Sequence, residues 1–456
     1  MILKVTALNG CNWGAAFPPA WLLVLLIVAC PTLLWSAGIY RDGVGARAMS
    51  LGGAEVGQPD APLEALHSNP AGLSLITAPT LQLGAGAGLA EGTFSQRNAR
   101  DGHIENGLGY WPEFAVSLPV KSTGLTLGAG FFPDALLSGD WRYDDPPGGL
   151  GGVSYGRQKQ FSELILLRGA LGASYAISKT LSVGAGLGIV YNRNRLEAPY
   201  IFQSHPKLRG FKTLLDLEAD GVGVNGNFGL VYRPHTNFSV GLSYHTETRV
   251  RTTGDASGNA GAQLQTLGGA FATVRPDFHY DAEVQNIFPQ MASLGLSWRL
   301  HPRLRALAQV DWIDWSDSFD LLRINLTHGN NADLNQFLGT DSAPDRVPLN
   351  WNDRFVYRAG LEFSLTEQLT LRGGYCYGHS PVPDETLTPL TAAIMEHKLT
   401  AGLGWQHARY SVDLAYQYDF PASQSVGLSA LAAGEYSHTR TEVSAHWFGL
   451  TTSVRF

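Results

Sequence analysis

The stretch "YSVDLAYQY" at residues 410–418 alternates between apolar and polar side chains at every step. One face carries Tyr410, Val412, Leu414, Tyr416 and Tyr418, and the other carries Ser411, Asp413, Ala415 and Gln417. A period of two predicts a β-strand with one apolar face. The same alternation occurs at residues 304–312, 355–363 and 446–456. Strands therefore dominate the chain from residue 79 onward.

The connections between these predicted strands alternate between short and long. Short turns fall at 121–123, 178–180, 233–236, 301–303, 366–368 and 407–409, and longer loops lie near 92–110, 134–160, 195–214, 253–272, 317–350, 379–394 and 421–435. Six turns and seven loops separate fourteen strands, and this strict alternation is typical of outer-membrane barrels. We therefore predict an all-β fold, a 14-stranded antiparallel transmembrane β-barrel over residues 79–456.

The composition agrees with a barrel. Only 16% of the residues are charged, against roughly 25% in soluble domains, and the mean hydropathy is close to zero. Aromatic residues gather at strand ends, as in Trp312 with Trp315 and Tyr375 with Tyr377, where interfacial girdles form. The net charge of −7 argues against a nucleic-acid partner. The thirteen histidines show no HxxxH or HExxH spacing, so we expect no metal and no cofactor.

Residues 1–37 resemble a secretory signal peptide, with an apolar run at Trp21–Ala29 and small residues before a cleavage point after Ala37. An alternative is lipoprotein processing with lipidation at Cys30. The segment contains one lysine and no acidic residue, so its removal changes the net charge from −7 to −8. Cleavage also leaves Cys376 as the last cysteine, which excludes an intramolecular disulfide.

The segment at residues 38–78 lacks a strand pattern and carries few charges, and it contains "LEALHSNPAGLSLITA" from residue 63 onward. A fourteen-strand barrel is too wide for the side chains of its wall to fill. We therefore predict that residues 38–78 form a plug, or hatch, inside the lumen. Pro70 forbids a continuous helix and Asn69 favours a turn, which predicts a tight turn at Asn69–Pro70. A flexible N-terminal tail is the alternative.

Three stretches together carry a family resemblance. They are "RAMSLGGAEVGQPDAPLEALHSNPAGLSLI" (47–76), "VDWIDWSDSF" (310–319) and "YRAGLEFSLTEQLTLRGGYCYGHSPVPDET" (357–386). The first resembles the N-terminal hatch of the FadL/TodX family of bacterial outer-membrane transporters for long-chain fatty acids and other hydrophobic compounds, with Asn69, Pro70 and Ala71 on its hallmark motif. The resemblance implies a hatch-closed barrel in the outer membrane, with passive uptake through an apolar pocket.

The resemblance also implies a sideways exit where the third strand kinks. That strand reads "GLTLGAGFFPDALLSG" (124–139), and its proline cannot donate to the ladder. The lateral opening is accordingly predicted at Gly130, Phe131, Phe132, Pro133 and Asp134. The alternative is that the proline simply ends the strand and begins a loop.

A carboxylate head group would need a cation, and the resemblance places Arg323 there. A second family arginine falls on Ala198, so Arg193 and Arg195 are the neighbouring substitutes. They share the face of the apolar Ile189, however, which predicts that they point outward at the rim toward lipopolysaccharide phosphates. This departure leaves fatty acid as a ligand in doubt.

Inward parity places several charges on the lumen side. These are Arg305, Asp311, Arg358, Glu362, Arg372 and Asp413, which we expect to pair with one another and hold the hatch. The terminal Phe456 resembles the recognition signal read by the outer-membrane assembly machinery. Cys376 has inward parity as well and is expected to be an inert small residue.

The sequence thus predicts passive uptake of hydrophobic small molecules, first of all long-chain fatty acids, by a protein that is not an enzyme. Its partners would be that ligand, outer-membrane lipid and lipopolysaccharide. Alternatives are an importer of aromatic or aliphatic hydrocarbons and a structural or adhesive surface barrel. A surface hydrolase would need more than Ser444 and His446, which share one face without a completing partner.

Overall fold

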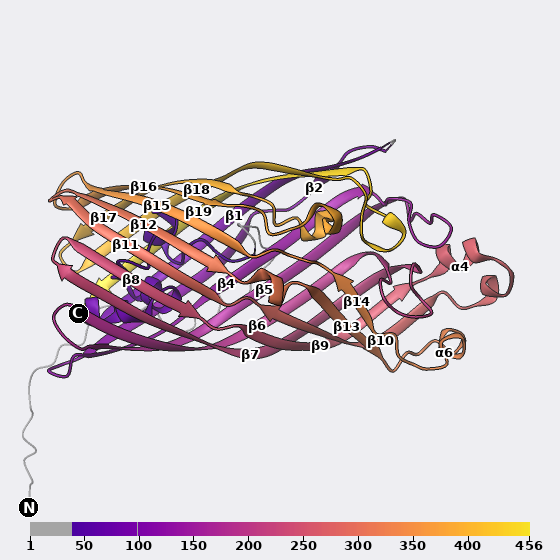
Figure 1. Ribbon diagram of the computed structural model, residues 1–456, viewed down its shortest axis with the longest axis horizontal. Helices are drawn as coiled ribbons and strands as arrows, with labels where there is room; N and C mark the ends of the chain where they lie inside the picture. The colour runs from indigo at the N-terminus through magenta and orange to yellow at the C-terminus, as the bar shows by residue number, and fades with distance from the viewer. Residues whose placement is uncertain (1–38, 98) are drawn as a thin grey trace, which may run out of the picture.

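The computed structural model describes residues 39–97 and 99–456, so the predicted signal peptide and Cys30 lie outside the described residues. The wall is a closed antiparallel barrel of fourteen strands (Figure 1). It closes where β1 (Thr80–Gln96) pairs with β19 (Thr439–Arg455) in an unbroken antiparallel register. Closure leaves no sheet edge facing lipid, where unpaired backbone groups would have no hydrogen-bond partner.

Nine wall strands are continuous and five are each interrupted once. Besides β1 and β19, the continuous strands are β4 (Leu125–Asp144), β5 (Arg157–Ala176), β6 (Leu181–Ile201), β7 (Lys212–His235), β16 (Leu369–Gly378), β17 (His397–His407) and β18 (Tyr410–Val426). The interrupted strands are β2 (Gly102–Ile104) with β3 (Gly109–Val120), β8 (Phe238–His245) with β9 (Thr248–Asn259), β10 (Asp277–Phe288) with β11 (Met291–His301), β12 (Leu304–Ile313) with β13 (Leu321–Thr327), and β14 (Asp345–Pro348) with β15 (Arg354–Ser364).

Short helices occupy the N-terminal region and the connections. They are α2 (Ala46–Ser50), α3 (Pro62–His67), η1 (Pro70–Leu75), α4 (Gly261–Leu267), η2 (Gly269–Thr273), α5 (Trp315–Ser318), α6 (Ala332–Leu338), η3 (Asp384–Thr386), η4 (Pro389–Thr391) and η5 (Ala432–Gly434). Within the described part of the chain, no helix has the length and apolar character needed to cross a membrane.

The short turns gather at one end of the barrel and the long loops, with α4 and α6, at the other (Figure 1). The predicted loops are too long, because β4 and β5 shorten the 134–160 loop to residues 145–156, and β13 and β14 lie inside the predicted 317–350 loop. Beyond the membrane the outward residues become polar, as Asp216 and Glu218 do on β7, so the alternation fades while backbone pairing continues.

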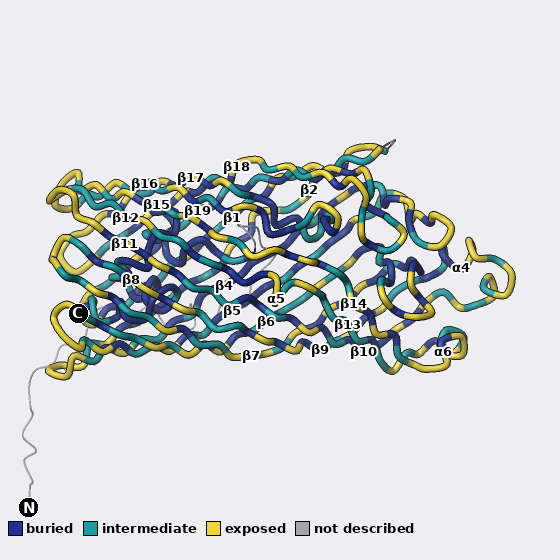
Figure 2. The backbone as a smooth tube through the Cα atoms, in the orientation of Figure 1, coloured by how far each residue is buried: buried dark blue, intermediate teal, exposed yellow. Residues whose placement is uncertain are grey.

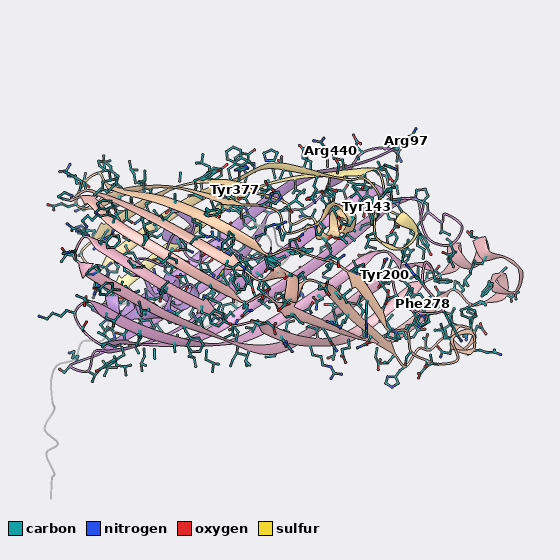
Figure 3. The ribbon with its side chains drawn as sticks, viewed as in Figure 1. Arg97, Tyr143, Tyr200, Phe278, Tyr377 and Arg440 are labelled. Carbon is teal, nitrogen blue, oxygen red and sulfur yellow. The ribbon has the colours of Figure 1, made fainter. Side chains whose placement is uncertain are left out.

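The outer face is apolar at mid-height. Val222 and Val224 on β7 are 64% and 63% exposed, and exposed and buried residues alternate along the strands (Figure 2). Tyr377, labelled in Figure 3, stacks on His397 at 4.8 Å between ring centroids, as expected of an interfacial girdle. Trp315 was expected in that girdle, but it is 1% exposed, because the chain leaves the wall after β12 and forms α5.

Residues 39–78, called here the N-terminal segment, lie inside the barrel (Figure 1). Helix α2 contacts β16 to β19, α3 contacts β1 and β3 to β5, and η1 contacts β4 to β7. The segment therefore meets the wall on most sides. Most of its side chains are buried, and Val44, Leu63 and Leu73 have no exposed surface.

Candidate ligand path and lateral opening

The ladder between the second and third wall strands is broken. β3 pairs with β4 as far as Phe114 opposite Phe131, and β2 resumes the pairing only at Ile104 opposite Trp141. On its other edge β4 stays paired with β5, with a register shift between Pro133 and Ala135. The chain continues as a strand beyond the proline, so the proline does not end it. It forms a bulge, where its missing N–H is tolerated.

The N-terminal segment takes up the free edge of β4. The N–H of Arg41 donates to the carbonyl of Asp134 at 3.1 Å, and the N–H of Leu136 donates to the carbonyl of Ile39 at 3.0 Å. All residues from 132 to 139 are buried. β4 therefore bends into the lumen here and leaves the line of the wall.

The residues predicted for the lateral opening lie at this break. Phe131 stacks on Phe114 with ring centroids 5.9 Å apart, and Phe132 has no exposed surface. A Cβ on Gly130 would lie 3.0 Å from a methyl of Leu66. That a ligand leaves at Gly130–Asp134 stays a prediction, while the broken ladder is a property of the fold.

An apolar cluster fills the interior beside the break. It joins Ile39 of the N-terminal segment, Leu136 of β4 and Leu387 of the 379–396 connection. That connection was expected as an outer loop, but it folds into the lumen, where Ser162 of β5 donates to the carbonyl of Leu390 at 2.9 Å. The run "PLTAAIM" at 389–395 is the sequence signal, because it is apolar without alternation.

Aromatic rings form a second part of the interior. Trp315 lies edge-on to Trp351 at 5.1 Å between centroids, and Phe319 stacks on Trp351 at 4.6 Å. Tyr40 approaches Trp315 at 5.8 Å. The stretch "VDWIDWSDSF" thus supplies rings to the lumen through α5, which the alternation of the flanking strands does not predict.

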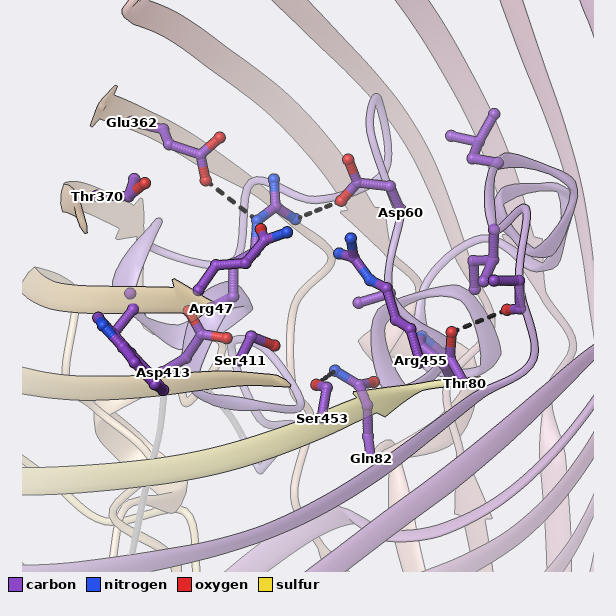
Figure 4. A pocket seen from close by; sticks show the side chains of 18 of the residues that line it. Arg47, Asp60, Thr80, Gln82, Glu362, Thr370, Ser411, Asp413, Ser453 and Arg455 are labelled. Atoms are coloured by element: carbon purple, nitrogen blue, oxygen red, sulfur yellow. Dashed lines mark hydrogen bonds and ion pairs between the residues drawn. The ribbon is translucent and has the colours of Figure 1, made fainter. Parts of the chain in front are cut away.

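The end of the barrel with the short turns is polar. A cavity of about 340 Å³ lies there between the N-terminal segment and the wall (Figure 4). Arg47 reaches Asp60 and Glu362, each at 3.1 Å, across this space. A straight path along the barrel axis would therefore end among charged groups.

The inward charges pair with one another, as predicted. Arg305 lies 3.1 Å from Glu362, and Arg372 bridges Glu362 at 2.8 Å and Asp413 at 2.6 Å. The next pairs join the wall to the N-terminal segment.

The second group of charges centres on Asp42 of the N-terminal segment. Arg358 contacts Asp311 at 2.7 Å and Asp42 at 3.0 Å, and Lys398 also pairs with Asp42. Burial alone would raise the pKa of the Asp42 carboxyl, but Lys398 and Arg358 outweigh burial and hold this pKa below its usual range. Cys376 is buried beside them, 3.6 Å from Asp42.

The Asn69-Pro70-Ala71 motif begins a 3-10 helix and is not the tight turn expected from the sequence. The Oδ1 of Asn69 accepts from the N–H of Ala71 at 3.1 Å and caps η1, while Pro70 takes the first helical position. The Nδ2 of Asn69 donates to the carbonyls of Val56 and Leu230. A turn and a capped helix share these residue preferences, so the motif alone does not separate them.

Glycines of the wall let this motif approach closely. A Cβ on Gly229 of β7 would lie 1.9 Å from Oδ1 of Asn69, and one on Gly184 of β6 would lie 2.3 Å from the N of Ala71. On β8, a Cβ on Gly241 would lie 1.9 Å from the carbonyl oxygen of Val56. The motif therefore rests directly on bare backbone.

Arg323 does not face the lumen. On β13 the buried Ile324 and Leu326 belong to the inner apolar cluster, so Arg323 points to the opposite side, where Arg346 is its neighbour in register. The reason is α5, which resets the parity between β12, where Asp311 faces inward, and β13. The structure thus removes the geometric basis for Arg323 as a head-group ligand inside the barrel.

Arg193 and Arg195 lie on the outer face of β6, as their parity predicts. Arg193 pairs with Glu163 at 2.6 Å and Arg195 with Glu218 at 3.7 Å. Contact with lipopolysaccharide phosphates stays a prediction. In the described part of the chain, Asp255, His279 and Asp281 come close enough to share a cation, and all three are exposed.

Comparisons with known proteins agree on the fold. A Pseudomonas aeruginosa FadL homologue is similar with a TM-score of 0.74 at 15% identity, over 92% of this chain and 100% of that one. The Pseudomonas putida toluene transporter TodX gives 0.73 at 21% identity over 92% and 100%. The Ralstonia pickettii toluene transporter TbuX gives 0.70 at 20% over 91% and 99%. No curated protein matches the sequence.

The family comparison covers nearly the whole chain. The model described as outer membrane protein transport protein (OMPP1/FadL/TodX) matches residues 34–456, which includes the N-terminal segment and every wall strand. The chain therefore belongs to the OMPP1/FadL/TodX family of outer-membrane transport proteins, whose members carry hydrophobic compounds.

Proposed function

We propose that this transporter takes up long-chain fatty acids passively and releases them sideways through the break between β3 and β4. The observation that carries the proposal is the unpaired edge of β4 at residues 132–140, which lies between the apolar interior cluster and the lipid-facing surface. An apolar chain gains about 0.8 kcal/mol per buried CH₂, so it would stay within apolar surroundings along this path.

In this proposal the N-terminal segment is the hatch. Its ion pairs to Arg358, Lys398 and Glu362 hold it across the lumen, and the polar cavity beside Arg47 offers no apolar surface to a ligand moving along the axis. A lateral exit spares the ligand this charged region. The exposed apolar band of the wall would contact outer-membrane lipid, and Phe456, which is 63% exposed, would serve recognition by the assembly machinery.

A second candidate ligand is an aromatic hydrocarbon. The rings of Trp315, Phe319 and Trp351 lie together in the lumen, and aromatic rings pair favourably with one another. Two of the similar structures are toluene transporters. The same sideways route would serve such a ligand, so the two candidates differ in ligand and not in path.

Deleting Asp134 tests the path. This residue is the extra one at the bulge, so its deletion allows β4 to pair regularly with β5 and straighten toward β3. Asp134→Asn is the matched control, since it keeps the bulge. Uptake of radiolabelled oleate and toluene is measured in a Gram-negative host that lacks its own uptake protein.

We expect the deletion to abolish uptake of the transported ligand and Asp134→Asn to preserve it, with both variants showing the heat-modifiable band of a folded barrel. Normal uptake by the deletion variant would refute the lateral route. Uptake of toluene without oleate would assign the hydrocarbon role.

A further inference from the structure

Arg168 is a buried cation whose donors find no acceptor. It lies on the lumen face of β5, directly opposite Phe132 of the bent part of β4, and its side chain has no exposed surface. None of its three guanidinium nitrogens makes a hydrogen bond to any described residue. A buried charged group without hydrogen bonds is costly, so such a group points to an interaction with something outside this set of residues.

The one charged neighbour of Arg168 among the described residues does not satisfy these donors. Asp134, at the bulge of β4, places Oδ2 3.8 Å from Nη1 of Arg168, which is too far for a hydrogen bond. The carboxylate offsets the charge, while the N–H groups remain free. An arginine has five such donors in a planar fork that matches a carboxylate.

The wall is shaped to hold this guanidinium. A Cβ on Gly188 of β6 would lie 2.5 Å from Nε of Arg168 and 2.2 Å from Oδ1 of Asn225. Both side chains thus occupy the space above a residue that has none. Oδ1 of Asn225 is also buried without a hydrogen bond.

A small cavity lies beside this group. It measures about 50 Å³, and Tyr40, His67, Asp134 and Asn225 are among its lining residues. One water molecule takes about 30 Å³ in the liquid, so this space suits a carboxylate and not an alkyl chain. Apolar side chains adjoin it, because Phe132 and Val190, the register partners of Arg168, are fully buried.

We propose that Arg168 binds the carboxylate of an anionic amphiphile in transit, at the inner side of the break between β3 and β4. The head group forms charge-assisted hydrogen bonds with the guanidinium, and the apolar chain lies against the bent part of β4. This inference rests on the proposed function and decides between its two ligand classes, because a neutral hydrocarbon gains nothing from Arg168.

The test compares two probes that differ only in the head group. Binding of laurate and of 1-dodecanol to the purified full-length protein in detergent is measured for wild type, Arg168→Met and Arg168→Lys. Arg193→Met is the matched control, an arginine on the neighbouring strand that faces outward. Heat-modifiability on gels verifies the fold of each variant.

We expect Arg168→Met to weaken laurate binding by about 10- to 100-fold, as loss of charge-assisted hydrogen bonds does, and to change dodecanol binding less than twofold. Arg168→Lys keeps the charge but loses the fork and should fall in between, which also covers the case in which Arg168→Met does not fold. The control should bind both probes as wild type does.

The failures are distinguishable. If wild type binds both probes and the Arg168 variants weaken neither, or weaken both equally, the carboxylate role is overturned while the proposed function stands. If wild type binds neither probe, the proposed function itself is overturned.

Discussion

The N-terminal segment meets the barrel through two faces that differ in chemistry. Toward β15 to β17 it is held by charges, with Asp42 between Arg358 and Lys398. Toward β6 to β8 it rests on bare backbone, with Asn69 against Gly229. The charged face depends on groups that must be present, and the glycine face depends on atoms that must be absent. One face fixes the position of the segment, and the other sets how closely it approaches.

Removing Arg358 should have the largest effect on this comparison. Arg358→Met leaves Asp311 without its ion-pair partner and takes one of two from Asp42, and breaking a buried pair costs about 3–5 kcal/mol. We expect the N-terminal segment to become sensitive to protease and the barrel to conduct ions in planar bilayers. Arg195→Met, on the outer face, should do neither; equal conductance of the two variants would contradict a dominant charged face.

Adding atoms to the glycine face should come next. In Gly229→Leu the new Cβ collides with Asn69, and overpacking of this kind costs about 1–3 kcal/mol. Gly226→Leu on the same strand is the control, since its Cβ would find no atom nearer than 3.6 Å. Protease accessibility of the N-terminal segment should rise in the first variant only. If both variants resist protease alike, the close approach has no energetic role.

Acid should loosen the segment between these two faces, at His67 of α3. Burial lowers the pKa of His67 to about 4, so between pH 6.5 and 4 the undocked segment binds more protons than the docked one. Its docking free energy should therefore fall by about 2 kcal/mol from pH 7 to pH 5.

Hydrogen exchange of the N-terminal segment at the two pH values measures this effect, with His67→Gln as the comparison. Burial raises the pKa of the neighbouring Glu55 well above its usual value, so that group titrates in the opposite sense. Only the difference between wild type and His67→Gln isolates the histidine. A difference of zero would contradict the expectation.

The smallest effect should follow loss of the helix cap at Asn69. Asn69→Ala removes the cap of η1 and the hydrogen bond to Leu230, which together cost about 1–2 kcal/mol. Asn331 caps α6 among the outer loops, so Asn331→Ala removes an equivalent cap far from the lumen. The midpoint for protease release of the N-terminal segment should shift for Asn69→Ala alone; a similar shift in both variants would sink the idea.

The alternation of the sequence predicted the strand count, the turns and the faces of single residues such as Arg193, because each strand is a local pattern. It failed at Arg323, since α5 resets the parity and no local signal records that change. It also failed for the 379–396 connection, whose apolar run seats itself in the lumen only once a lumen exists.

Arg168 marks the boundary between these cases. Its inward parity with Ala170 and Ser174 is readable from the sequence. That its donors lack acceptors depends on Asp134 and Asn225, which come from other strands, and so on the folded barrel.

The hydrogen bonds of Ile39 and Arg41 to β4 make the mobile part of the transporter and its wall share one ladder. Thermodynamic linkage then applies to the pair. Any cargo that binds differently when this ladder is made or broken must shift its population, and breaking the ladder must change the affinity for that cargo by the same factor. Such a protein requires no separate signal between lumen and exit, because occupancy and aperture are two readings of a single equilibrium.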